Sequence, residues 1–195
     1  MRIGARDWRV IIGRVHSPEH ACLLSDELGV LVSGDQVLPR IASNVSVFPT
    51  EPHADPLGEW LASIEHLRSM LVDHLLVLPA HVQPFCGLHD RLDRLAHGHD
   101  RGLQRLRQSL ADIPKRAIDV FGALCARPID NNGHLLGLAT RKSLAHINHL
   151  LARCEAASEL DADGVRRQRM KQAWPQASPV HVLNMHDLLS RDMPG

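Results

Sequence analysis

The stretches His16-Ser17-Pro18-Glu19-His20, Ser33-Gly34-Asp35 and Leu78-Pro79-Ala80-His81 decide the fold of this chain. Each of them follows a short apolar run that is typical of a β-strand, and the three come in compact succession. Loops at the ends of adjacent strands can hold side chains near one point. If these strands are adjacent, one histidine or aspartate from each stretch can serve a common site.

His16, Asp35 and His81 are the candidate metal ligands in these stretches. Imidazole nitrogen and carboxylate oxygen are ligand types of zinc, and also of iron or manganese. An aspartate can bridge two metal ions about 3.5–4 Å apart, which together activate a hydroxide and hold a carbonyl or phosphoryl oxygen. Each residue alone is a weak signal, because Gly-Asp is common in turns and a histidine at a strand end is usually not a ligand.

Apolar periodicity predicts the elements around these stretches. Strands are expected at 8–13, 21–24, 30–33 and 74–78, and the prolines between 39 and 56 break any regular element there. Leucine and isoleucine at helical spacing predict one helix over 56–71, with Asp55 as its N-cap and Pro56 at its first position. A second helix is expected over 88–110.

The C-terminal third has a different pattern. We expect a helix over 114–124, a loop over 127–137, a helix over 141–154, and a hairpin of 157–160 with 165–170. Two helices followed by a small hairpin are typical of a winged helix. From residue 172 onward, repeated prolines predict a loose tail.

Composition excludes some classes of function. Lys+Arg and Asp+Glu are both 22, so no net charge favours nucleic acid or an anionic membrane as partner. Aromatic residues make up 3% of the chain, which supplies few platforms for base stacking. The four cysteines lie far apart and form no C-x-x-C, and no signal peptide or transmembrane run is evident. We therefore expect a cytoplasmic protein that does not enter membranes.

The three stretches, in this order, resemble successive motifs of the metallo-β-lactamase superfamily. Three further stretches are similar to its subgroup with a C-terminal winged helix: 44–49, 54–57 and 140–147. The resemblance covers about residues 8 to 170. It implies an α+β fold in which residues 1–110 form the second half of the αββα sandwich, 111–171 a small helical winged-helix-like domain, and 172–195 the tail.

The resemblance also implies roles for single residues. His16 would be the third histidine of the first metal site, Asp35 the bridging carboxylate, and His81 the last ligand of the second site. Arg40 would meet an anionic group of the substrate, with a solvated loop arginine as the alternative reading. His20 lies in the motif without a ligand role.

The chain departs from the family at several positions. The His-x-His-x-Asp-His motif of the first half is not in this sequence. His97-Gly98-His99-Asp100 does not replace it, because on a helix residues two apart point about 200° apart; His99 is expected on the buried stripe instead. Val15 and Val82 stand where glycine is common in the family.

The resemblance therefore implies a zinc-dependent hydrolase that acts on a thioester, another acyl ester or a phosphodiester through a metal-activated water. A complete site would hold two zinc ions on about six protein ligands. With three of them we expect zero or one weakly bound ion, and a truncated chain that is inactive alone.

Two other classes of function stay open. The expected hairpin carries basic residues that could bind the phosphates of a nucleic acid: Arg166, Arg167, Arg169 and Lys171. A sheet without its partner sheet would expose an apolar face, which could dock on another protein or on a second copy of the chain.

Overall fold

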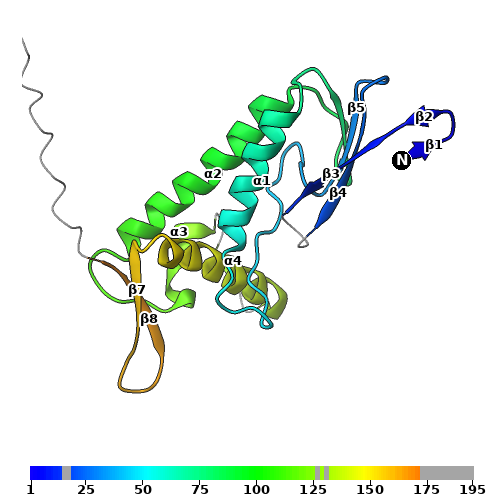
Figure 1. Ribbon diagram of the computed structural model, residues 1–195. Coiled ribbons are helices and arrows are strands. Elements are labelled where there is room, and N and C mark those ends of the chain that lie inside the picture. Colours follow the sequence, from blue (N-terminus) through cyan, green and yellow to red (C-terminus); the bar gives the residue numbers. More distant parts are fainter. Residues whose placement is uncertain (15–18, 126–127, 130–131, 172–195) are drawn as a thin grey trace, which may run out of the picture.

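The computed structural model describes residues 1–14, 19–125, 128–129 and 132–171. A four-stranded sheet forms one end of the molecule (Figure 1). Its strand order is β3-β4-β5-β6, with antiparallel pairing along β3, β4 and β5 and parallel pairing between β5 and β6. The strands span Arg9–Gly13 (β3), His20–Ser25 (β4), Val30–Gly34 (β5) and Leu76–Pro79 (β6). The four strands predicted from sequence are confirmed to within two residues.

The two faces of this sheet differ in burial. Alternate residues of the strands are buried beneath the helices, among them Ile11, Cys22, Leu31 and Val77. The opposite face is open: Val10 is 49%, Ile12 45% and Leu76 40% exposed. A hairpin that the sequence did not predict, β1 (Arg2–Ile3) with β2 (Arg6–Asp7), precedes the sheet.

Two long helices pack beside the sheet. Helix α1 (Pro56–Met70) connects the parallel strands β5 and β6, and α2 (Leu88–Ser109) follows β6. Asp55 caps α1 as predicted, since its Oδ1 accepts a hydrogen bond of 2.9 Å from the amide of Gly58. The buried stripe of α1 contains Leu57, Trp60, Ile64 and Leu67, so the helix presents its apolar side to the core.

The other end of the molecule is built from short elements and one more long helix. A 3₁₀ turn, η1 (Ala117–Val120), continues into α3 (Phe121–Leu124), where one helix was expected. Helix α4 spans Gly133–Ala152, and the antiparallel hairpin of β7 (Ala156–Leu160) and β8 (Arg166–Met170) follows it, as predicted. The loop expected over 127–137 is wrong in its second half, because the side chain of Asn132 accepts from the amides of His134 and Leu135 and starts α4 eight residues early.

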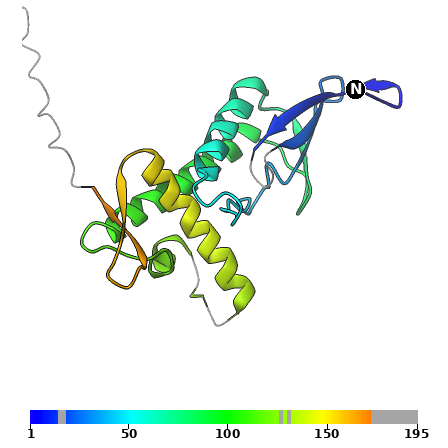
Figure 2. The ribbon, with the colours of Figure 1, turned by 60° about the horizontal axis from the view of Figure 1, so that its bottom comes forward.

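Helix α2 runs from the sheet end of the molecule to the hairpin of β7 and β8 (Figure 1). In the turned view, α4 crosses in front of α2, and α3 lies beside α4 (Figure 2). The winged-helix assignment of 111–171 and the domain boundary at 110 stay predictions, and the tail at 172–195 lies outside the described residues. In the described part of the chain, no helix is long and apolar enough to cross a membrane.

Candidate functional site

Two of the three predicted ligands lie next to each other at the same edge of the sheet. His81 follows β6 and Asp35 follows β5, and the Nε2 of His81 lies 3.5 Å from the Oδ1 of Asp35. Their proximity follows from the parallel pairing of β5 with β6, which brings the ends of both strands to one edge.

The separation of this pair is compatible with a shared metal ion. The Oδ1 of Asp35 is buried and has no hydrogen-bond partner among the described residues, although the His81 ring is 66% exposed. Two donors bound tetrahedrally to one zinc ion at about 2.1 Å lie about 3.4 Å apart. The observed 3.5 Å therefore fits two ligands of one ion, and the donor types suit zinc.

Asp35 is held by a tight turn after β5. The amide of Gln36 donates to the carbonyl of Ser33 over 3.0 Å, and the Ser33 hydroxyl donates to the carbonyl of Val37 over 2.9 Å. The hydroxyl of Ser43 donates to the carbonyl of Asp35 itself. These bonds fix the backbone on both sides of the carboxylate, so its orientation costs little entropy when a ligand binds.

Gly34 makes this turn possible. Its φ of 54° lies in the left-handed region, which L residues with a side chain rarely adopt. The imidazole of His20 also lies directly over it: a Cβ added at Gly34 would stand 2.4 Å from the Nε2 of His20. His20 thus packs against the turn that carries Asp35.

The loop after β6 carries His81, and the residue that follows it has a strained backbone. The amide of Ala80 donates to the carbonyl of Gly34 over 3.0 Å, which ties this loop to the Asp35 turn. Val82 has φ 74°, an unfavourable conformation for a β-branched residue. This positive φ explains why glycine would suit position 82.

His16, the third predicted ligand, lies outside the described residues. Among the residues that the structure does describe, no group of three or more His, Cys, Asp or Glu side chains is arranged to hold a metal ion. The pair of Asp35 and His81 is thus what the described part of the chain contributes to the predicted centre.

Arg40 is exposed and lines a pocket of about 230 Å³ between α2, α4 and the segment 40–42. We call this the α2–α4 pocket. Its other lining residues include four more cationic side chains and two histidines: Arg91, Arg94, Arg105, Lys142, His99 and His146. Within the described ranges, no Asp or Glu lines it.

The two histidines of this pocket form a buried pair. The Nδ1 of His146 lies 2.9 Å from the carbonyl of Lys142, so it carries the proton, and the Nδ1 of His99 then donates to the Nε2 of His146 over 3.3 Å. Burial lowers the pKa of His99 to about 3 and that of His146 to about 4, and both rings are neutral at pH 7.

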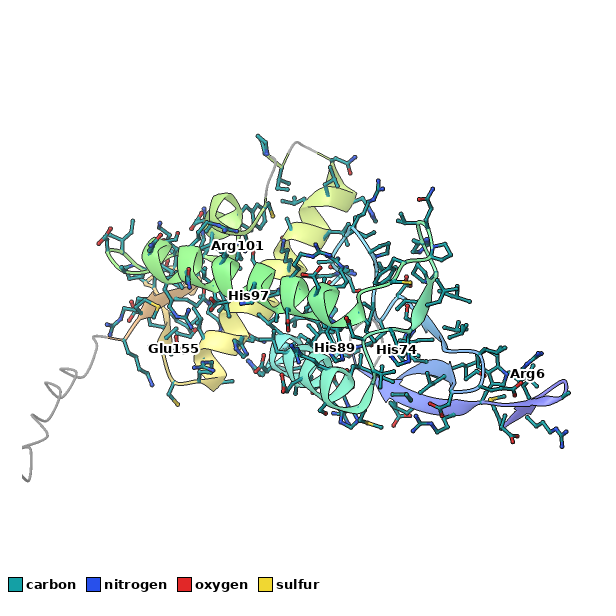
Figure 3. All side chains as sticks on the ribbon, turned by 90° about the horizontal axis from the view of Figure 1, so that it is seen from above. Arg6, His74, His89, His97, Arg101 and Glu155 are labelled. Atoms are coloured by element: carbon teal, nitrogen blue, oxygen red, sulfur yellow. The ribbon has the colours of Figure 1, made fainter. Side chains whose placement is uncertain are left out.

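His97 and His99 face different pockets, as expected for residues two apart on a helix. His99 lies on the buried side of α2, whereas His97 is exposed and lines a second pocket beside Asp100 and His149. Figure 3 shows His97 and Arg101 on α2. These two histidines therefore do not converge on one point.

The cations of the β7–β8 hairpin mostly have partners within the hairpin. Arg167 lies 2.6 Å from Asp161 and Arg169 lies 3.4 Å from Glu159, while Arg166 donates to the hydroxyl of Ser158. Paired arginines present less net positive charge to a nucleic acid than the sequence alone indicates.

The cations of the α2–α4 pocket other than Arg40 were not predicted from the sequence. Arg91, Arg94 and Arg105 recur at spacings of three and eleven residues, which keeps them on one side of a helix. This spacing was the available signal. This spacing does not by itself indicate a pocket, because basic residues on one side of a helix are usually solvated. The pocket forms only when α4 packs against α2.

Comparisons with known proteins point to one family. Residues 103–171 match the family model of the metallo-beta-lactamase-like C-terminal domain. A crystal structure of a beta-lactamase domain protein from Burkholderia ambifaria is 41% identical, with a TM-score of 0.82 over 88% of this chain and 50% of that one. A metallo-beta-lactamase family protein from Thermus thermophilus is 23% identical, with a TM-score of 0.73 over 88% of this chain and 52% of that one.

The chain thus spans about half the length of the two solved proteins it matches. No curated protein matches it. Across the part that is covered, the strands and helices described above have the arrangement of these relatives.

Proposed function

We propose that this chain, which shares the metallo-β-lactamase fold of its structural relatives, supplies metal ligands and substrate contacts to a metal-dependent hydrolase. The convergence of Asp35 and His81 carries the proposal. Sequence separation of 46 residues would not bring these two side chains to 3.5 Å unless the fold did so, and the Oδ1 of Asp35 is left without a hydrogen-bond partner in the described part of the chain.

His16, Asp35 and His81 would hold the metal in this proposal. When bound, zinc supplies a Lewis acid and lowers the pKa of a bound water towards neutrality. The chain's own residues bind and orient: the turn at Gly34 fixes the carboxylate, and the loop after β6 presents the imidazole. The substrate class is a thioester, another acyl ester or a phosphodiester, and Arg40 would contact an anionic part of it.

The remaining ligands would come from a segment that carries the His-x-His-x-Asp-His motif. We propose that such a segment packs on the open face of the sheet, where Val10, Ile12 and Leu76 are exposed. On this proposal the 195-residue chain alone binds one ion weakly at most, and it is inactive until the second set of ligands is present.

Zinc binding to single-residue variants tests the proposed ligands. We expect Asp35→Ala and His81→Ala each to weaken zinc affinity at least tenfold, measured by competition with a chromogenic chelator. His74→Ala is the matched control, because His74 is exposed and precedes β6 rather than following it. Equal zinc affinity in the parent chain and all three variants would contradict the assignment.

Complementation tests the hydrolase proposal itself. A polypeptide bearing the missing motif, taken from a relative and added to the chain, should restore tight zinc binding and turnover of a p-nitrophenyl ester or a thioester. Complexes that form without gain of either property would contradict it.

A non-catalytic binding role is the second candidate. The exposed apolar residues on the sheet favour a protein partner or a second copy of the chain. Nucleic-acid binding through Arg166, Arg167, Arg169 and Lys171 stays a proposal with less support, given the ion pairs of Arg167 and Arg169.

A further inference from the structure

The α2–α4 pocket gathers five cationic side chains around a space of about 230 Å³. Three come from α2 and one from α4, and Arg40 comes from the segment that follows the Asp35 turn. Like charges brought together in a concave site repel one another, and this repulsion costs free energy unless an anion is bound. The arrangement therefore needs an explanation beyond packing.

Backbone carbonyls hold most of these cations in place. Arg91, which is 8% exposed, donates to the carbonyls of Leu38 and Ile41. The carbonyl of Ala123 accepts from the Nε of Arg105 over 2.7 Å. In the same way, the carbonyl of Leu124 accepts from the Nζ of Lys142 over 2.8 Å.

Carbonyl oxygens orient a cation without neutralising it. Among the five cations of the pocket, Arg94 has a carboxylate partner, Asp90 at 2.8 Å, whereas Arg91, Arg105 and Lys142 donate to carbonyls. Burial lowers the pKa of Arg91, and its neighbour Arg94 lowers it further. The pocket thus holds oriented donors whose positive charge is not balanced by a carboxylate among its described lining residues.

One of the residues that line this pocket is buried and has a polar atom without a partner in the described part of the chain. His99 is 7% exposed, and its Nε2 is the atom in question. The Nδ1 of this ring donates to His146, so the neutral ring offers a lone pair at Nε2. The ring also packs against the Trp60 indole, with 4.7 Å between the two ring centroids, and the Nε1 of that indole has no partner in the described part of the chain either.

We propose that the α2–α4 pocket binds the phosphate group of a small molecule. Guanidinium and ammonium donors match the oxygens of phosphate in charge and geometry. A pocket of about 230 Å³ has room for a phosphate group with a small substituent.

This proposal does not require a metal at Asp35 and His81. Its test uses the full chain in the presence of EDTA, with inorganic phosphate and pyrophosphate as the probes and isothermal titration calorimetry as the measurement. We expect saturable binding of one probe molecule per chain even though EDTA removes any bound metal. If the hydrolase proposal is contradicted by its own tests, the phosphate-binding result expected here stays the same.

Gly98 allows the pocket to be blocked without removing any cation. It lines the pocket and is helical, and a Cβ there meets nothing within 4 Å among the described residues. Gly98→Glu places a carboxylate beside the cations and should weaken phosphate binding at least tenfold. Gly137→Glu is the matched control, because Gly137 is also helical with open space but does not line the pocket.

A second pair of variants tests the charges. Lys142→Met should weaken phosphate binding at least tenfold, whereas Arg101→Gln, on α2 but outside the pocket, should leave it unchanged. Circular dichroism confirms that each variant is folded.

Three results would overturn the proposal. The first is no saturable binding of either probe up to about 10 mM, which corresponds to less than about 3 kcal/mol of binding free energy. The second is an equal loss of phosphate affinity in the pocket variants and in their controls. The third is binding of a single-stranded RNA that phosphate does not displace.

Discussion

Gly34 combines a left-handed backbone with a neighbour that leaves no room for a side chain. We expect Gly34→Ala to destabilise the chain by about 2–3 kcal/mol, since the backbone alone costs about 1–2 kcal/mol and the Cβ must displace His20. Urea denaturation followed by circular dichroism measures this change.

Gly29 is the control for this prediction. Its φ of 62° is close to that of Gly34, but a Cβ there meets nothing within 4 Å in the described part of the chain. Gly29→Ala should therefore show the backbone cost alone, and a Gly29→Ala effect as large as that of Gly34→Ala would contradict the role of His20.

Val82 is strained by its backbone rather than by its side-chain contacts. Its φ is 74° and the residue is 51% exposed, so Val82→Gly should relieve strain while losing little packing. We expect a gain in stability of about 1 kcal/mol. Val72→Gly, at the same exposure but without a positive φ, should lower stability, and a gain in both variants would argue against the strain.

His99 and His146 make the stability of the chain sensitive to acid. Their folded-state pKa values of about 3 and about 4 lie below the unfolded value of 6.5. Below pH 6.5 the unfolded state therefore binds more protons than the folded state does. Their stabilising contribution is complete above pH 6.5. It falls by about 1.4 kcal/mol per pH unit for each histidine as the pH drops towards about 4.

Urea denaturation between about pH 7 and pH 4.5 measures this slope. A His99→Leu variant removes one of the two titrating groups, so its stability should fall less steeply than that of the parent chain. Parallel curves for the two proteins would contradict the prediction.

At the scale of residues, Asp35 and His81 lie close together as predicted, because each follows an apolar run that forms a strand and the two strands pair in parallel. Their role as metal ligands stays a prediction. It did not predict the cations of the α2–α4 pocket. Lys142 lies 51 residues from Arg91 and on another helix, so only packing reveals that both line one space.

At the scale of elements, the start of α1 shows how a cap can join two helices. Asp55 accepts from the amide of Gly58, and it also lies 3.0 Å from the Nδ1 of His149 on α4. We expect Asp55→Ala to lower stability by about 1–2 kcal/mol, because it removes the cap and the contact with α4. Asp55→Asn should cost less, since its side-chain oxygen still caps the helix.

Thermal denaturation of the two variants checks this order. If Asp55→Asn and Asp55→Ala lost equal stability, the carboxylate charge facing His149 would matter more than the cap, contrary to this prediction.

Elements with regular apolar spacing were predicted well, whereas the start of α4 was not. Helix α2 has leucines at Leu88, Leu92 and Leu95 that indicate one face, and its bounds agree with the prediction within a residue. The start of α4 depends on hydrogen bonds to the side chain of Asn132, in a stretch with two glycines that reads as a loop.

For the whole molecule, the open sheet face predicts self-association. Val10 and Ile12 project from β3 on the exposed face, and Leu76 on β6 is also exposed. We expect the chain to associate as its concentration rises, and Val10→Thr with Ile12→Thr to reduce this association. Sedimentation velocity measures the mass. Val72→Thr is the control, at similar exposure outside the sheet, and a monomeric parent chain would contradict the prediction.

Helix α2 has contacts along its whole length with both ends of the molecule. Asp93 pairs with Arg68 of α1 at 2.7 Å, and Arg91 donates to the segment after the Asp35 turn. Near its other end, Arg107 lies 2.6 Å from Glu155 at the start of the β7–β8 hairpin. Separation of either end would remove part of the packing of α2. We therefore expect the sheet and the hairpin to unfold in one cooperative transition, with the amides of α2 exchanging their hydrogens with solvent last in a hydrogen-exchange measurement.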